Sequence, residues 1–141
     1  MAETMKRANT QARWAGVFIA LALCMASGAA LARTADMYDA PKVLAVSATP
    51  LDASQTRDRI VAGGQALGWV VTREAPGLVE LSYDKQGKHQ VTVAVRYEPT
   101  GYKIDYVTSF NLNYEEIGGV RKIHPNYNRW ILNLIKRIGP V

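Results

Sequence analysis

The fold is decided by residues 78–110, which read LVELSYDKQGKHQVTVAVRYEPTGYKIDYVTSF. Apolar and polar side chains alternate along this stretch, which is the period of β-strands that bury one face. Turn-type sequences rich in Gly, Pro and Lys interrupt the alternation, and connections this short join antiparallel neighbours. With the run that precedes Pro76-Gly77, the pattern predicts a four-stranded meander over residues 69–75, 78–84, 89–98 and 102–110. One face of the sheet should be buried and the other wet.

A helix is predicted at the end of the chain. Its apolar side chains fall at helical spacing on one continuous stripe: Tyr127, Trp130, Ile131, Leu134, Ile135 and Ile138. Pro125 suits the first turn, His124 or Asn126 can cap the start, and Gly139-Pro140 ends the helix. The stripe must pack on something, and the apolar face of the sheet is the large partner that the sequence offers.

A second helix is predicted over about residues 52–67. Two starts are open: a Thr49 cap followed by Pro50, or an Asp52 cap with Gln55 three residues later. Gly63-Gly64 inside it costs about 1 kcal/mol per glycine relative to alanine. Either the helix is weak there or its backbone approaches a neighbour closely.

These elements predict an α+β fold, a two-layer sandwich in which two helices cover one face of the sheet. Val43-Leu44 and Val46 form a short apolar run that is compatible with a further strand. The sheet is therefore expected to be an antiparallel meander of four or five strands, within a single domain over residues 43–141.

Residues 1–32 have the pattern of an export signal. Three cations, Lys6, Arg7 and Arg13, precede an uncharged run over residues 14–32 that ends in Ala30-Leu31-Ala32. Small side chains at positions 30 and 32 suit a signal peptidase, so cleavage is predicted after Ala32. An uncleaved membrane anchor is the alternative, because about 20 apolar residues can span a bilayer. Residues 33–42 are polar and aperiodic and are predicted to be a flexible arm.

Cys24 is the single cysteine of the chain and lies inside that apolar run. A lipid anchor on Cys24 would tether the mature protein, but Leu23 stands where a lipoprotein signal has a small residue. Two sulfurs are needed for an intramolecular disulfide, so one cysteine excludes it.

Composition bounds the possible functions. The chain has 141 residues and is 48% hydrophobic, which fits one small globular domain and excludes disorder along its length. Without residues 1–32 it keeps 14 basic and 11 acidic residues, a net charge of +3. That excess and an exported location do not indicate a nucleic-acid partner.

The segment around the last helix resembles a family of small bacterial proteins. Ile123-His124-Pro125-Asn126-Tyr127-Asn128-Arg129-Trp130 is the specific part, and weaker similarity covers about residues 55–138. The family that this motif resembles consists of exported or lipid-anchored proteins. The resemblance implies an envelope location, in the periplasm or secreted, and a compact α+β domain, but it implies no particular reaction.

Few residues are equipped for catalysis. The two histidines, His89 and His124, lie far apart in the sequence, and no spacing of His and Cys predicts a transition-metal site. A phosphate loop, a nucleophile elbow and a dinucleotide fingerprint are absent from the sequence, so no cofactor is predicted. His124 can cap the last helix or act as a general base at its terminus.

Asn128 and Arg129 have no folding role that the sequence reveals. Arg129 could pair with Glu115 or Glu116, or offer its guanidinium to a carboxylate or phosphate of a partner. His124, Asn128 and Arg129 are therefore the candidate binding residues.

The sequence favours a non-enzymatic envelope module that binds a protein, a peptide or an anionic envelope component. Binding would use the wet face of the sheet or the loop before the last helix. The alternative is a small hydrolase or transferase that uses His124 with a neighbouring acid.

Overall fold

The computed structural model describes residues 33–49 and 51–141. In this part of the chain the elements are β1 (Ala35–Asp36), β2 (Val43–Leu44), α1 (Ala53–Ala66), β3 (Val70–Ala75), β4 (Leu78–Lys85), β5 (His89–Glu98), β6 (Gly101–Phe110), β7 (Glu115–Ile117), β8 (Val120–Ile123) and α2 (Pro125–Ile138). Neither helix is both long enough and apolar enough to cross a membrane. The predicted cleavage after Ala32 and the question of Cys24 lie outside the described residues.

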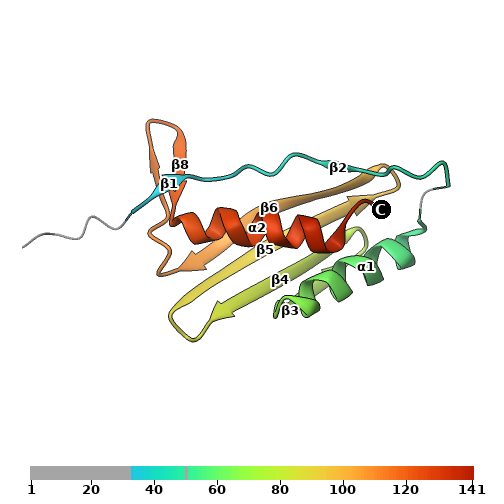
Figure 1. Ribbon diagram of the computed structural model, residues 1–141, viewed down its shortest axis with the longest axis horizontal. Coiled ribbons are helices and arrows are strands. Elements are labelled where there is room, and N and C mark those ends of the chain that lie inside the picture. The colour runs from blue at the N-terminus through green and yellow to red at the C-terminus, as the bar shows by residue number, and fades with distance from the viewer. Residues whose placement is uncertain (1–32, 50) are drawn as a thin grey trace, which may run out of the picture. The chain divides into compact units, whose positions relative to one another are not determined.

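The main sheet has five antiparallel strands in the order β2-β6-β5-β4-β3 (Figure 1). Strands β3 to β6 form the predicted meander, and each begins and ends within one residue of its expected position. The short run at Val43 supplies the fifth strand, which pairs with the start of β6 through Tyr102 and Gly101. The α+β fold predicted from the alternation is confirmed.

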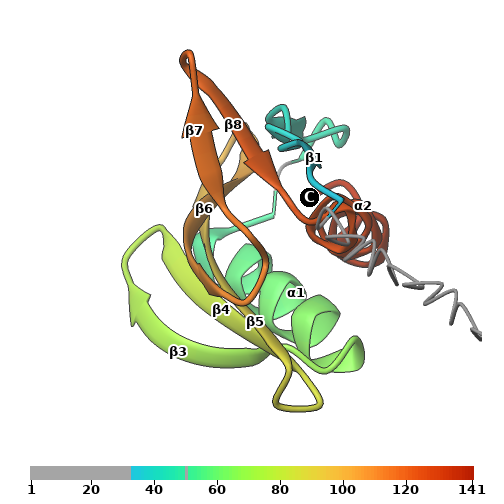
Figure 2. The ribbon, with the colours of Figure 1, turned by 90° about the vertical axis from the view of Figure 1, so that its left-hand side faces the viewer.

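Both helices lie on the same side of the main sheet (Figure 2). The stripe on α2 buries Tyr127, Ile131, Leu134 and Ile138, and α1 buries Ile60 beside them. They meet the inward side chains of the strands, which are Val79, Leu81, Val91, Val93, Val95, Tyr102 and Ile104. The helices leave the opposite face of the sheet uncovered, as the alternation predicts.

Each helix begins at a cap that the sequence contains. The Asp52 carboxylate accepts a hydrogen bond from the Gln55 backbone N–H at 2.8 Å, and the Gln55 side chain accepts from the Asp52 N–H at 3.1 Å. This reciprocal pair is a capping box, so the Asp52 start holds rather than the Thr49 start. At α2 the His124 Nδ1 accepts from the Asn126 N–H at 3.2 Å, which makes His124 the cap.

The two glycines inside α1 mark close packing. A Cβ atom at Gly63 would lie 2.8 Å from Ile138 Cγ1, and one at Gly64 would lie 2.9 Å from Leu81 Cδ1. Real Cβ atoms do not approach other atoms so closely, so a side chain at either position would displace its neighbour. The close-approach interpretation is therefore the one that the structure supports: Gly63 faces α2 and Gly64 faces β4.

A second, three-stranded sheet has the order β1-β8-β7 and was not predicted. Its hairpin, β7–β8, turns at Gly118 and Gly119, which both have positive φ angles. Strand β1 comes from the segment for which the sequence predicts a flexible arm, residues 33–42. This arm pairs Ala35 with Ile123 and places Ala40 in the core at 2% exposure. It is thus built into the domain by backbone pairing and burial.

Candidate functional site

A concavity in the described part of the chain lies between α2, the segment that follows α1 and strand β4. It has a volume of about 230 Å³ and is lined by Leu67, Trp69, Tyr83, Arg129, Trp130 and Asn133. We call it the aromatic cleft. Three of these side chains are aromatic, one is a cation and none is an acid, so its chemistry suits a ligand with a flat or apolar surface and a negative charge.

The end of α1 positions one wall of the cleft. The Gly64 carbonyl accepts two hydrogen bonds of 3.0 Å, one from the Leu67 N–H and one from the Trp69 N–H. These two bonds tighten the last turn of α1. Gly68, at φ 86°, then turns the chain from α1 into β3. Because of this tight turn, Leu67 remains exposed at the mouth of the cleft while Trp69 is only 3% exposed behind it.

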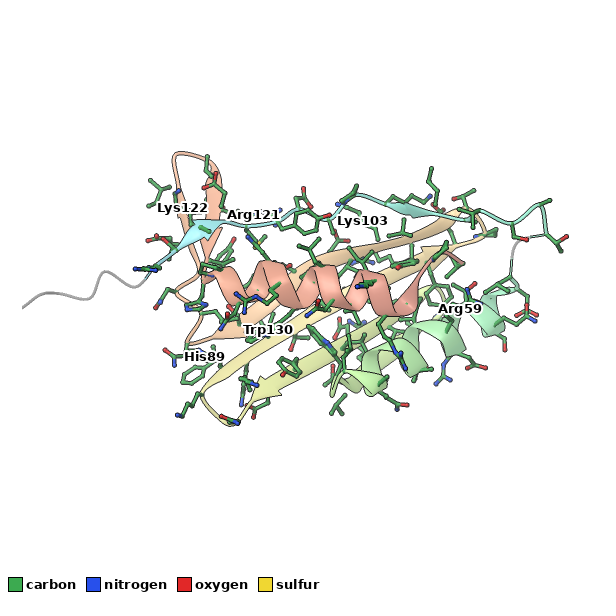
Figure 3. The ribbon with its side chains drawn as sticks, viewed as in Figure 1. Arg59, His89, Lys103, Arg121, Lys122 and Trp130 are labelled. Carbon is green, nitrogen blue, oxygen red and sulfur yellow. The ribbon has the colours of Figure 1, made fainter. Side chains whose placement is uncertain are left out.

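The aromatic rings form a continuous series across the cleft. The centroids of Trp69 and Tyr83 are 5.3 Å apart, and those of Tyr83 and Trp130 are 5.0 Å apart with an interplanar angle of 68°. Trp130 projects from α2 on the side that faces β4 (Figure 3). Like Ile135 it is only partly buried against the core, whereas the other four members of the predicted stripe are fully buried. Its exposed part, with that of Tyr83, forms an open corner of two rings.

Arg129 is the charged group of the cleft. The alternative in which it pairs with Glu115 or Glu116 is not realised, because within the described residues Arg129 makes no ion pair. Four other arginines do make one: Arg57, Arg73, Arg96 and Arg121. The Arg129 side chain is exposed on α2 beside Trp130. Its guanidinium is therefore available to a ligand.

Asn128 has a structural role that the sequence did not reveal. Its side-chain carbonyl accepts from the Tyr38 N–H at 2.8 Å, and its amide donates to the Asp36 carbonyl at 2.9 Å. Both ends of the amide are thus used to fasten the arm to α2. Asn128 is committed to the fold and does not line the aromatic cleft.

The two histidines, distant in sequence, are stacked in the structure. Their ring centroids are 5.7 Å apart with an interplanar angle of 27°. The Nδ1 atom of His89 lies 2.7 Å from the Asn111 carbonyl, which only accepts, so Nδ1 of His89 carries the proton. His124 Nδ1 accepts the capping bond, so His124 holds its proton on Nε2. The described residues contain no group of three metal-ligating side chains.

Charge on much of the remaining surface is neutralised locally. Lys42 pairs with Glu98, and this hydrogen bond lowers the pKa of the Glu98 carboxyl. Hydrogen bonds from Lys103 to Asp105 and from Lys122 to Asp36 raise the pKa values of these lysines. The exposed cations of α2, which are Arg129, Lys136 and Arg137, have no such partners among the described residues.

The structure therefore separates the three candidate residues. His124 caps α2 and Asn128 holds the arm, whereas Arg129 alone lines the cleft. Sequence reasoning missed the other lining residues, which are Leu67, Trp69, Tyr83, Trp130 and Asn133. A signal for Asn133 was present, since positions 129 and 133 are one helical turn apart and face the same way.

Comparison with known proteins does not assign the chain to a family. No protein-family model, no curated protein and no solved structure matches the chain. The candidate site consequently rests on the geometry of the aromatic cleft.

Proposed function

We propose that this chain is an exported, non-enzymatic module of the bacterial envelope that binds an anionic envelope component in the aromatic cleft. The observation that carries the proposal is Arg129, an exposed guanidinium without an ion-pair partner in the described structure, placed beside the open corner of Tyr83 and Trp130. An unpaired arginine next to aromatic rings is well suited to carboxylate or phosphate recognition.

The electrostatic surroundings support an anionic ligand. After Glu116 the sequence contains no further acid, while α2 carries Arg129, Lys136 and Arg137 on its exposed side. The positive potential along α2 would speed the encounter with an anion, whereas direct contact with Arg129 would retain it in the cleft. Exposed charges are screened by salt, so binding should weaken as ionic strength rises.

The alternative function, a hydrolase or transferase that uses His124, receives less support. A general base needs a free ring nitrogen, and the His124 Nδ1 already accepts the capping bond from Asn126. The titratable ring stacked beside it is His89 rather than a carboxylate that could orient it. His124 serves as a cap in this geometry.

An envelope pull-down tests the proposal. The tagged full chain is crosslinked in cells, and the captured envelope components are compared for the parent, Arg129→Ala and the matched control Lys136→Ala. Lys136 is exposed on the same helix, two turns away, and does not line the cleft. Parent and control should capture the same component, and Arg129→Ala should lose it while keeping the parent's circular dichroism spectrum. Equal capture by Arg129→Ala and the parent would refute the assignment.

The exported location has its own test. Mass spectrometry of the N-terminus of the protein isolated from cells should find Arg33 as the first residue, as expected for cleavage after Ala32. An intact Met1 would refute cleavage, and an acylated Cys24 would establish the lipid anchor in its place.

A further inference from the structure

The shape of the aromatic cleft restricts the size of its ligand. Its volume of about 230 Å³ lies below the range of roughly 300–1,000 Å³ that accommodates drug-sized molecules. The rings of Tyr83 and Trp130 meet at an interplanar angle of 68°, so their exposed parts form a corner rather than a flat platform. A single six-membered ring with its C–H groups against an aromatic face fits such a corner, because the faces of aromatic rings carry partial negative charge.

The polar groups of the cleft restrict the chemistry further. Arg129 presents a fork of N–H donors that matches a carboxylate. Asn133 follows one helical turn later, with its amide exposed, about 6 Å away along α2. The ligand should therefore carry a carboxylate and, at about that separation, a neutral group that both donates and accepts hydrogen bonds.

A saccharide combines these features better than a peptide or a lipid does. Three of the six lining side chains end in polar groups, namely Tyr83, Arg129 and Asn133, whereas the side-chain pocket for an apolar peptide residue would be mostly apolar. A fatty acid has a carboxylate but no second polar group for Asn133. A sugar ring has apolar C–H faces, polar edges and, in acidic sugars, a carboxylate.

We infer that the aromatic cleft binds an acidic sugar, with the pyranose ring against Trp130 and Tyr83, the carboxylate on Arg129 and a hydroxyl or acetamido group on Asn133. This inference rests on the proposed function and names the ligand class of the same site. It involves no covalent step.

The chain provides its own reporter for a binding test. Its three tryptophans are Trp14, Trp69 and Trp130, and the last two line the cleft. In the full chain carrying Trp14→Phe, kept in a neutral detergent, tryptophan emission therefore reports on the cleft alone. The probes are N-acetylmuramic acid, N-acetylglucosamine, which has the same ring without the carboxylate, and N-acetylphenylalanine, a peptide-like carboxylate.

N-acetylmuramic acid should change the emission and saturate, and N-acetylglucosamine should bind at least about tenfold more weakly. Arg129→Gln should remove the difference between the two sugars, whereas Lys136→Gln should leave it unchanged. Both substituted side chains are exposed, so both variants are expected to fold.

Equal binding of the two sugars, or no binding of either, would overturn the inference. Tighter binding of N-acetylphenylalanine than of N-acetylmuramic acid would also overturn it, in favour of a peptide ligand. The envelope pull-down distinguishes these results from failure of the proposed function: capture that depends on Arg129 would keep that function, with a ligand of another class.

Discussion

Asn128 should hold the arm in place, and replacing it should release the arm without unfolding the domain. The residue makes two hydrogen bonds to the arm, one to the Tyr38 N–H at 2.8 Å and one to the Asp36 carbonyl at 2.9 Å. A typical intramolecular hydrogen bond contributes about 0.5–1.5 kcal/mol net. Asn128→Ala should therefore lower the free energy of unfolding by about 1–3 kcal/mol.

Asn128→Asp separates the two bonds. The aspartate can still accept from the Tyr38 N–H, but its second oxygen would face the Asp36 carbonyl, where two acceptors repel each other. Its negative charge near the start of α2 recovers about 0.3–1 kcal/mol by interacting with the helix dipole. Asn128→Asp should thus remain destabilised, by about 1 kcal/mol.

Hydrogen exchange at single amides is the assay that locates the effect. The Tyr38 amide should exchange faster in Asn128→Ala, and that of Met37, bonded to the Arg121 carbonyl, should follow it. Asn133→Ala is the matched control, since Asn133 is exposed on the same helix and does not contact the arm. The reasoning is refuted if the Tyr38 amide keeps the parent's protection in Asn128→Ala.

Three further predictions follow from the packing and the caps. Gly63→Ala should destabilise the domain by up to about 2 kcal/mol, as measured by urea denaturation. Overpacking against Ile138 costs about 1–3 kcal/mol, which outweighs the gain of about 1 kcal/mol in helix propensity. A more stable variant would contradict the close approach of Gly63 to Ile138. His124→Ala should cost about 1 kcal/mol of thermal stability, and His124→Ser should restore most of it as an alternative cap; an equal loss in both would show that the cap is not the cause. Burial raises the pKa of Tyr102 to about 12 from an ordinary 10.0, so the folded state retains the phenol proton at a pH where the unfolded state has lost it. The contribution of Tyr102 to the free energy of unfolding is complete below about pH 10 and is lost as the pH rises toward 12. In Tyr102→Phe the urea midpoint should therefore fall less steeply over that interval than in the parent. An unchanged slope would contradict the raised pKa of Tyr102.

The local pattern was enough to predict the main sheet and both helices. The side chains alternate from Val79 to Tyr106 because one face of the sheet is buried, and the apolar stripe on α2 exists because that helix packs against the same core. Burial is periodic in the sequence wherever a regular element packs on a single partner. For that reason the meander and α2 could be predicted almost to the residue.

The arm and the small sheet could not be predicted in this way. Strands β1 and β7 have two and three residues, too few to show a period. The contacts of Asn128 span about 90 residues, and a side-chain amide that bonds distant backbone leaves no local signature. Asn128 consequently resembled a residue without a folding role.

The candidate site was predicted only at Arg129. The cleft collects Leu67 and Trp69 from the end of α1, Tyr83 from β4, and Arg129, Trp130 and Asn133 from α2. Trp130 lies on the apolar stripe, so the pattern assigned it to the core although part of its ring is exposed. Convergence of three elements is a tertiary property, which neither the spacing nor the composition of one segment encodes.

The pairing of β1 with β8 also determines when the first strand can form during synthesis of the chain. Asp36 and Lys122, whose side chains are 2.9 Å apart, are separated by 86 positions, so the first strand has no partner until β8, at Val120–Ile123, has been delivered. If residues 1–32 are an export signal, only two residues, Arg33 and Thr34, separate the cleaved bond from β1. A peptidase then works on an unpaired, extended segment for as long as β8 and α2 have not yet emerged. The signal would thus be removed before the domain closes, because the two-residue strand β1 stays unpaired until β8 has emerged.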